Sequence, residues 1–221
     1  MDAETTAARK QELRRTLRAR RTETYSGQAG ARRRTEEAER ILAHASPLVV
    51  AVERAVAHAA AQDAAPPLVA AFHPTPTEAD VMPLARRLAD AGARLVFPAA
   101  ASGEELEWVA WDGSSEFLPS PGKGFGREPQ GERLGTGALA EAMLVLTPAV
   151  AVDRSRTRIG HGAGYYDRAL TTIPRSAMVV AVIHPDELLE KGALARSEHD
   201  VPIPAVLTAD GLVSLVTSAG F

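Results

Sequence analysis

Apolar and basic residues are arranged at helical spacing near the start of the chain. Leu13 and Leu17 lie four residues apart, so they share one face of a helix predicted over residues 5–21. Tyr-Ser-Gly at 25–27 predicts a break, and a second helix is expected from about residue 31 to residue 45, ended by Pro47. Residues 48–62 are rich in Ala and Val and could form a further helix.

From residue 68 onward, short apolar runs alternate with helical patterns. The runs predict strands over residues 68–72, 94–97, 106–111, 143–146 and 178–183, with short end pieces at 206–207 and 213–216. Helices are predicted over 81–91, with Pro83 in the first turn, and over 164–172. Residues 112–135 are rich in Gly, Pro and Ser, which predicts a long loop.

Alternating strands and helices are typical of an α/β fold. We expect a largely parallel sheet flanked by helices on both faces, in a three-layer, Rossmann-like arrangement. Residues 1–221 are interpreted as a single domain, with basic helices over 1–45 and an α/β body over 68–221.

Composition narrows the class of protein. The 221 residues are 45% hydrophobic and 24% charged, as in an ordinary globular protein. No apolar run approaches the ~18–20 residues of a membrane span, the Arg-rich start lacks the apolar region of a signal peptide, and cysteine is absent. We therefore expect a cytoplasmic protein with no membrane partner.

The net charge of −3 is unevenly distributed. Residues 1–40 hold 11 Lys/Arg against 7 Asp/Glu, so the N-terminal part is basic. A basic segment can face nucleic acid or a phosphorylated small ligand. Because the isoelectric point of about 6.1 is well below that of dedicated nucleic-acid-binding domains, we expect no nucleic-acid partner.

The segment 158–167 reads Arg-Ile-Gly-His-Gly-Ala-Gly-Tyr-Tyr-Asp and is the strongest candidate for chemistry. Its three alternate glycines permit positive φ and close approach of the backbone to a ligand, and they precede a predicted helix. Arg158 adds a forked cation suited to phosphate. The segment is neither a Walker loop nor a dinucleotide fingerprint, and on spacing alone it could also be a tight strand-to-helix turn.

This segment resembles the signature of the 5-formyltetrahydrofolate cyclo-ligases, Arg-Leu-Gly-x-Gly-(Gly/Lys)-Gly-Tyr-Tyr-Asp-Arg, with Ile159 in place of Leu and Ala163 in place of Gly or Lys. The preceding residues 147–153 are similar to the family's Pro-Gly-x-x-Phe-Asp lead-in. The resemblance extends over nearly the whole chain. It includes the Lys10-x-x-Leu-Arg14 opening, Glu78, and the segments 126–129 and 198–203.

The resemblance implies ATP- and Mg²⁺-dependent closure of 5-formyltetrahydrofolate to 5,10-methenyltetrahydrofolate through a phosphorylated formyl group. It assigns a catalytic role to Lys10, Arg14 and Arg158, whose positive charges would stabilise the transferred phosphoryl group. ATP would be bound by Lys10, Gln11, Glu12, Leu13, Arg14, Arg158, Ile159, Gly160, His161, Gly162, Ala163, Gly164, Tyr165 and Tyr166. Magnesium would be held by Asp167 and Asp200.

The same resemblance assigns folate binding to one set of residues. These are His73, Glu78, His161, Gly162, Ala163, Gly164 and Tyr165, which would meet the pterin and the glutamate tail. Two departures from the family pattern stand out, because Ala163 carries no charge and Pro204 occupies a position where a second acid often follows Asp200. His161 is interpreted as lining the pocket rather than as a catalytic group.

Residue types alone leave other interpretations open. Lys10 and Arg14 could be a solvated helix face, and Glu78 could be a charge at a helix N-terminus. At the level of function, the alternatives are an ATP-dependent enzyme for another formyl or amide substrate, and a non-catalytic nucleotide-binding module. We expect a monomer with small-molecule partners, the folate and ATP.

Overall fold

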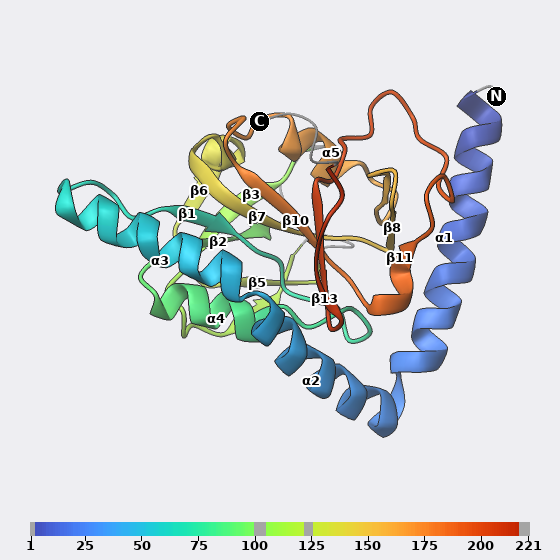
Figure 1. The fold of residues 1–221 in the computed structure, drawn as a ribbon, viewed down its shortest axis with the longest axis horizontal. Helices are drawn as coiled ribbons and strands as arrows, with labels where there is room; N and C mark the ends of the chain where they lie inside the picture. The colour runs from blue at the N-terminus through green and yellow to red at the C-terminus, as the bar shows by residue number, and fades with distance from the viewer. Residues whose placement is uncertain (1–2, 100–104, 122–125, 217–221) are drawn as a thin grey trace.

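The computed structural model describes residues 3–99, 105–121 and 126–216. The N-terminal segment forms three helices, α1 (Ala3–Tyr25), α2 (Gly27–His44) and α3 (Ser46–Ala61) (Figure 1). The predicted break at 25–27 is confirmed. Pro47 does not end α2 as predicted but lies in the first turn of α3. An N–H at this position has no acceptor within the helix, so proline, which lacks the N–H, is tolerated there. None of the described helices has the length and apolar character needed to cross a membrane.

An eight-stranded sheet forms the centre of the molecule, in the order β13-β12-β10-β7-β1-β2-β3-β6. The five inner neighbours from β12 to β2 pair in parallel, whereas β13, β3 and β6 pair antiparallel at the two edges. The prediction of a largely parallel sheet is therefore confirmed. The strands are β1 (Leu68–Ala70), β2 (Arg94–Ala99), β3 (Glu107–Trp111), β6 (Arg133–Gly135), β7 (Ala142–Pro148), β10 (Met178–Val182), β12 (Ala205–Thr208) and β13 (Gly211–Ser214).

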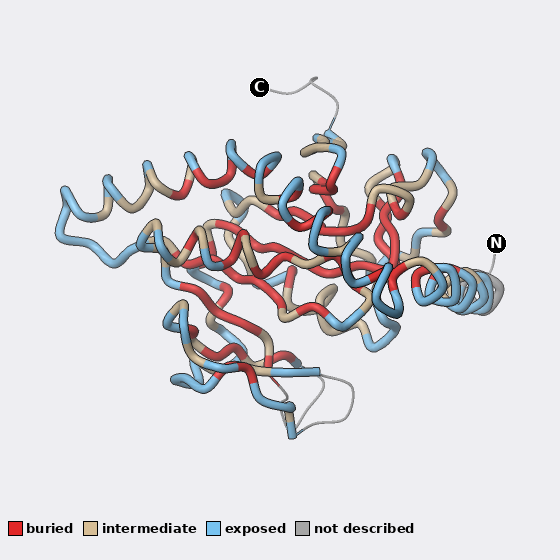
Figure 2. Tube along the Cα trace, turned by 90° about the horizontal axis from the view of Figure 1, so that it is seen from below, coloured by how far each residue is buried: buried red, intermediate tan, exposed pale blue. Residues whose placement is uncertain are grey.

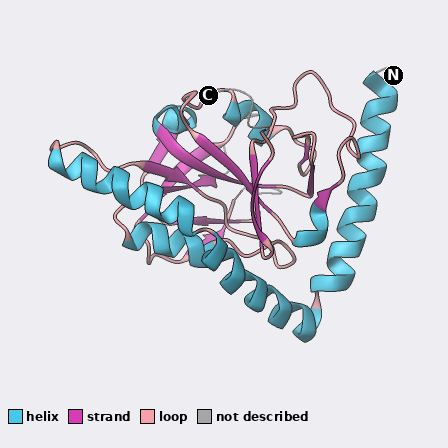
Figure 3. Ribbon diagram, in the orientation of Figure 1, coloured by secondary structure: helices cyan, strands magenta, loops and turns pink. Residues whose placement is uncertain are grey.

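Helices cover both faces of this sheet (Figure 3). Helices α2, α3 and α4 (Met82–Asp90) pack on one face, around a core that includes Phe97 and Leu146. The other face packs against α5 (Tyr165–Leu170) and the 3-10 helix η1 (Thr136–Glu141), around a core that includes Trp108. Figure 2 shows the buried strands between exposed helix faces, which confirms the predicted three layers.

The predicted loop over 112–135 is wrong in part, because it contains three strands of three residues each. In addition to β6, β4 (Phe117–Pro119) pairs antiparallel with β5 (Arg127–Pro129). A second small sheet, also not predicted, joins β11 (Leu188–Leu189), β8 (Ala151–Asp153) and β9 (Arg158–Ile159). Such strands are too short to show periodicity, so their pairing depends on partners that are distant in sequence.

Helix α1 lies against the three-stranded sheet β11-β8-β9 rather than the eight-stranded one. Leu17 packs with Ile159 and Leu194, which confirms the inward-facing Leu stripe. Beside it the guanidinium of Arg21, only 5% exposed, donates to Glu187 Oε1 at 2.6 Å and to the carbonyl of Ala149 at 2.7 Å. A buried charge with these partners fixes the helix in place, because moving the helix would separate the buried cation from its acceptors.

The joint between α1 and α2 sets the direction of α1, and Gly30 is essential to it. A Cβ at Gly30 would lie 2.2 Å from the carbonyl carbon of Tyr25, a clash with backbone that cannot move aside. We predict that Gly30→Ala lowers the free energy of unfolding by about 1–3 kcal/mol, the usual cost of overpacking, although alanine is the better helix former. Urea denaturation measures this change.

Gly137→Ala is the matched control for this substitution. Gly137 lies in η1, and a Cβ there would meet nothing within 4 Å. Its stability should change by less than about 1 kcal/mol. If Gly30→Ala and wild type have the same free energy of unfolding, the backbone between α1 and α2 can adjust to the added Cβ, and the prediction is wrong.

Candidate functional site

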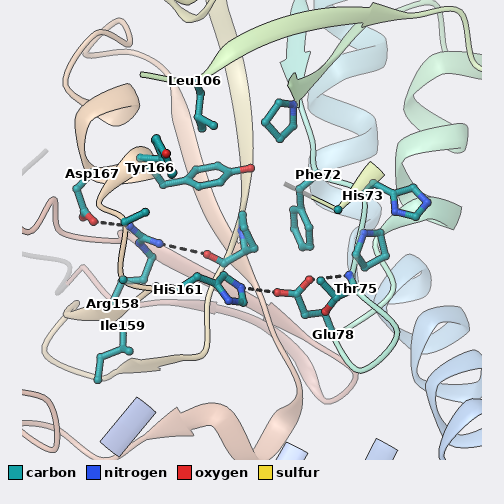
Figure 4. Close-up of a pocket in the computed structure, with 18 of the residues that line it drawn as sticks. Phe72, His73, Thr75, Glu78, Leu106, Arg158, Ile159, His161, Tyr166 and Asp167 are labelled. Atoms are coloured by element: carbon teal, nitrogen blue, oxygen red, sulfur yellow. Dashed lines mark hydrogen bonds and ion pairs between the residues drawn. The ribbon is translucent and has the colours of Figure 1, made fainter. Parts of the chain in front are cut away.

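A pocket of about 820 Å³ lies beyond the carboxyl ends of β1 and β7. Strand β2 lies on one side of β1 and β7 lies on the other, so the strand order reverses at this point. Sheets of α/β proteins commonly bind ligands at such a reversal. Six Lys or Arg side chains and four Asp or Glu side chains line the pocket. Figure 4 shows Arg158 and Asp167 on one side and His73 on the opposite side, with His161 and Glu78 facing each other between them.

The glycine loop, defined here as residues 160–164, forms one wall of the pocket. Gly162 has φ +111° and Gly164 has φ +70°, values that side chains with a Cβ rarely adopt. Gly164 precedes the first residue of α5, so its left-handed conformation turns the chain into that helix. A Cβ at Gly160 would lie 2.7 Å from Nη1 of Arg158, so glycine allows the guanidinium to pack behind the loop.

Helix α1 binds the backbone of this loop directly. Arg14 Nε donates to the carbonyl of Gly160 at 2.8 Å, and Arg18 Nη2 donates to the carbonyl of His161 at 3.0 Å. Burial, followed by the charge of Arg18, lowers the pKa of Arg14, which nevertheless remains a cation at neutral pH. The basic face of α1 is therefore part of the site rather than a solvated surface.

Two ion pairs lie at this end of the pocket. Lys10 Nζ binds the carboxylate of Asp200, and Arg158 Nη2 donates to Asp167 Oδ2 at 2.7 Å. The amide of Val201 donates to the other oxygen of Asp167 at 3.3 Å, which ties the two pairs together. Two of the three cations predicted to meet phosphate, Lys10 and Arg158, are thus paired with the carboxylates predicted to hold magnesium. Among the described residues, no group of three or more His, Asp or Glu side chains could hold a metal ion.

His161 connects α1 to Glu78. Its Nδ1 lies 2.8 Å from Arg18 Nη2, which can only donate, so Nδ1 must accept that hydrogen bond. The ring proton is then on Nε2, which donates to Glu78 Oε1 at 2.7 Å. The geometry therefore assigns His161 as the neutral Nε2–H tautomer.

Glu78 is the buried acid of the site, and only 5% of it is exposed. Burial opposes its ionisation, but the hydrogen bond to His161 is the strongest of several interactions that together lower its pKa to about 2. The amide of Thr75 donates to its Oε2 at 2.7 Å, and Arg21 Nη1 lies 3.6 Å from its Oε1. At neutral pH the pocket therefore contains a fixed carboxylate with acceptor capacity.

The remaining predicted residues divide into two groups. His73, Ile159, Ala163, Tyr165 and Tyr166 line the pocket together with those already described. In contrast, Gln11 and Glu12 are exposed, and Leu13 packs with the small hydrophobic cluster around Leu17, so this part of the chain reaches the pocket through Lys10 and Arg14.

The hydroxyl of Tyr166 is an unused donor at the site. It is buried, and no hydrogen-bond partner for it is found in the part of the chain that the structure describes. Burial raises the pKa of this tyrosine, so the group stays protonated. A ligand oxygen in the pocket could accept its hydrogen bond.

Three arginines that contact the His161–Glu78 pair or its backbone were not predicted from the sequence, and neither were Arg86 and Arg127, which line the pocket. Arg18 and Arg21 contact the His161–Glu78 pair, and Arg34 Nε donates to the backbone carbonyl of Glu78 at 2.8 Å. A signal for the first two was present, because Lys10, Arg14, Arg18 and Arg21 follow one another at four, four and three residues and so form one stripe on α1. No comparable pattern distinguishes Arg34 from its neighbours.

The low pKa of Glu78 predicts an effect of pH on stability. Its ionised form stabilises the fold above its ordinary pKa of about 4.5, and this contribution, about 3 kcal/mol, is lost as pH falls from about 4.5 to about 2. Glu78→Gln should therefore be less stable than wild type at pH 6, and the difference should shrink by pH 3. Urea denaturation at both values measures it. Glu36→Gln, at an exposed position, is the control, and a difference independent of pH would contradict the assignment.

Several known proteins are similar to this chain in sequence or in fold. The 5-formyltetrahydrofolate cyclo-ligase of Mycolicibacterium smegmatis is 35% identical over 153 residues, 66% of this chain and 76% of that protein. The cyclo-ligase of Escherichia coli K12 is 32% identical over 143 residues, 63% of this chain and 76% of that protein. The fold is shared with the 5,10-methenyltetrahydrofolate synthetase of Aquifex aeolicus, at a TM-score of 0.71 and 22% identity over 96% of this chain and 95% of that one. Residues 6–209 match the 5-formyltetrahydrofolate cyclo-ligase family, and the chain belongs to it.

Proposed function

We propose that this protein converts 5-formyltetrahydrofolate and ATP to 5,10-methenyltetrahydrofolate, ADP and phosphate, with Mg²⁺ as cofactor. Membership of the cyclo-ligase family supports the reaction. One observation carries it to this pocket: a glycine loop bordered by Lys10, Arg14 and Arg158 faces the same cavity as a buried, ionised Glu78. A polyphosphate suits the first, and a heterocycle rich in N–H groups suits the second.

The glycine loop and helix α1 would bind the ATP phosphates. Lys10 and Arg14 reach the pocket from α1, and Arg158 lies behind the loop. Phosphoryl transfer needs mainly positioning and positive charge on the moving oxygens, which these three cations and the loop amides supply. In the structure, Asp200 and Asp167 neutralise Lys10 and Arg158.

Asp167 and Asp200 would hold the magnesium ion. Magnesium in nucleotide sites takes one or two carboxylates together with phosphates and waters, and these two carboxylates line the pocket at its basic end. When bound with ATP, the ion supplies charge neutralisation on the phosphate oxygens. Binding of an anionic phosphate by Lys10 and Arg158 would free their carboxylate partners for the ion.

Glu78 and Tyr166 would orient the folate. The ionised carboxylate of Glu78 can accept hydrogen bonds from pterin N–H groups, and it is held in place by His161 and the Thr75 amide. The Tyr166 hydroxyl, which has no hydrogen-bond partner among the described residues, can donate to a folate oxygen. Phe72 and Leu106, both nearly buried, line the same space with apolar surface and help to exclude water.

The arrangement addresses a specific chemical difficulty. The formyl group on nitrogen is an amide, whose oxygen is a poor leaving group, so attack by the neighbouring nitrogen stalls. Transfer of the γ-phosphoryl group to the formyl oxygen converts it to phosphate. The second nitrogen then forms a bond to the formyl carbon and loses its proton to solvent, and the carbon–oxygen bond breaks as phosphate leaves. The product is the methenyl cation.

The first test is the reaction itself. We expect 5-formyltetrahydrofolate, ATP and Mg²⁺ together to give a rise in the absorbance of the methenyl product, with one ADP released per product. Omission of any one reactant should abolish the signal. If folded protein at saturating substrate forms no product, this function is excluded; product without ATP consumption would exclude the phosphorylated intermediate.

Arg14 tests the nucleotide end. We predict that Arg14→Ala loses most of the thermal stabilisation that Mg-ATP confers, because a charge-assisted contact worth about 2–5 kcal/mol is removed, or roughly 30- to 3,000-fold in affinity. The substitution also removes the hydrogen bond to Gly160, so the quantity to compare is the ATP-induced shift in melting temperature rather than the melting temperature itself.

Arg15→Ala is the matched control on the same helix. Its side chain is 77% exposed and pairs with Glu12, so it should retain the full ATP-induced shift. Equal shifts in the two variants would exclude Arg14 from the phosphate site and leave Arg158 and the glycine loop as its main components.

A further inference from the structure

His161 is the only residue of the glycine loop with a side chain larger than a methyl group. Its ring extends to Glu78, and Nε2 donates to Glu78 Oε1 at 2.7 Å (Figure 4). Its backbone carbonyl accepts a hydrogen bond from Arg18 Nη2 at 3.0 Å. In the proposed function the loop binds the ATP phosphates and Glu78 binds the pterin, so this one residue belongs to both binding sites.

The contact with His161 has a large effect on the state of Glu78. Burial alone would raise the pKa of this carboxyl, and the hydrogen bond from His161 is the strongest of the interactions that lower it to about 2. The amide of Thr75 also donates to Glu78, and Arg21 Nη1 lies 3.6 Å from its Oε1. Because the strongest of these contacts comes from the loop, the position and charge of Glu78 depend on where the loop lies.

Arg14 connects the same loop to the proposed phosphate site. Its Nε donates to the carbonyl of Gly160 at 2.8 Å, and a Cβ at Gly162 would lie 3.5 Å from its Cζ, so the guanidinium contacts the loop on both sides of His161. A guanidinium has five N–H donors, so Arg14 can hold the loop through Nε and a phosphate through its Nη groups at the same time. A phosphate that fixes Arg14 therefore also fixes the segment that carries His161.

Arg18 determines how the His161 ring is used. It lies one turn further along α1, and its Nη2 donates to Nδ1 of the ring at 2.8 Å as well as to the backbone carbonyl. With Nδ1 accepting this hydrogen bond, the ring proton is on Nε2 and faces Glu78. The contacts thus form a continuous path from the proposed phosphate site through Arg14, the loop and His161 to Glu78.

We propose that His161 couples the two substrate sites, so that bound ATP increases the affinity for 5-formyltetrahydrofolate and bound folate increases the affinity for ATP by the same factor. This inference rests on the proposed function. The equality of the two factors follows from thermodynamic linkage. A glycine-rich loop loses much conformational freedom when it is ordered, and the ligand that binds first orders it for the second. His161 and Arg18 are positioning residues, because they act on the folate through Glu78.

Two substitutions at His161 separate this role from simple packing. The side chain is 44% exposed and the backbone φ is not positive, so other side chains can replace it without backbone strain. His161→Leu removes the donor to Glu78. His161→Gln keeps an N–H donor at the same number of bonds from Cα, so it should restore the contact.

Calorimetry measures the coupling directly and without turnover. The dissociation constant of 5-formyltetrahydrofolate is determined with and without the β,γ-imido analogue of ATP and Mg²⁺, and that of the analogue with and without folate. In wild type each ligand should tighten the other about fivefold or more, the lower end of typical coupling between sites. In His161→Leu this factor should fall close to one, while the affinity for the analogue alone stays close to that of wild type. His161→Gln should recover most of the factor.

Arg18→Met tests the residue that sets the ring tautomer. It removes the donor to Nδ1 but keeps an unbranched side chain, so its coupling factor should lie below that of wild type. Arg15→Met is the matched control on the same helix, because Arg15 is exposed and pairs with Glu12. This control should keep the full factor.

The coupling and the proposed function can fail independently. A wild-type factor close to one, or an unchanged factor in His161→Leu, would overturn the coupling; a residue that only packs in the pocket would weaken binding in that variant and leave the factor unchanged. Coupled binding without methenyl product would support the coupling and reject the reaction, whereas product with uncoupled binding would reject the coupling alone. If wild type fails to bind either ligand, both proposals are rejected.

Discussion

The contact between helix α1 and the glycine loop is the interaction on which the site depends. A loop with three glycines has little conformational preference of its own, so something else must hold it. Arg14 and Arg18 bind two successive carbonyls of that loop, and Arg18 also fixes the ring of His161. The loop is thus held from outside by side chains that enter from more than 140 residues away in sequence.

Helix α1 is in turn held by a buried polar network. Arg21 binds Glu187, whose Oε2 accepts the amide of His184 at 3.0 Å. The His184 ring stacks on Tyr25 with centroids 3.5 Å apart, and its Nδ1 lies 2.6 Å from Glu37. Such groups are costly to bury singly but stable when every one is paired, so they hold α1 and α2 at defined positions on the sheet.

The same network reaches Glu78 in the pocket. His184 Nε2 lies 3.1 Å from the carbonyl of Thr77, and Arg34 binds the carbonyl of Glu78. Glu78 is therefore held in position by α1 and α2, and it is ionised at neutral pH because its hydrogen-bond and ion-pair partners lower its pKa. The basic helices that bind the glycine loop therefore also hold Glu78 in position.

The sequence by itself determined the fold class and the chemical type of the site. Apolar runs such as those at β7 and β10 are long enough to show their burial, and the glycines of residues 160–164 have a use that depends only on local backbone geometry. Only the tertiary structure decided which groups meet. The pairing of Lys10 with Asp200 and the His161–Glu78 bond join segments far apart in sequence. The short strands β4, β8 and β9 likewise exist through their partners. Local propensity carries no record of such contacts, because their energy arises only when the chain brings the two groups together.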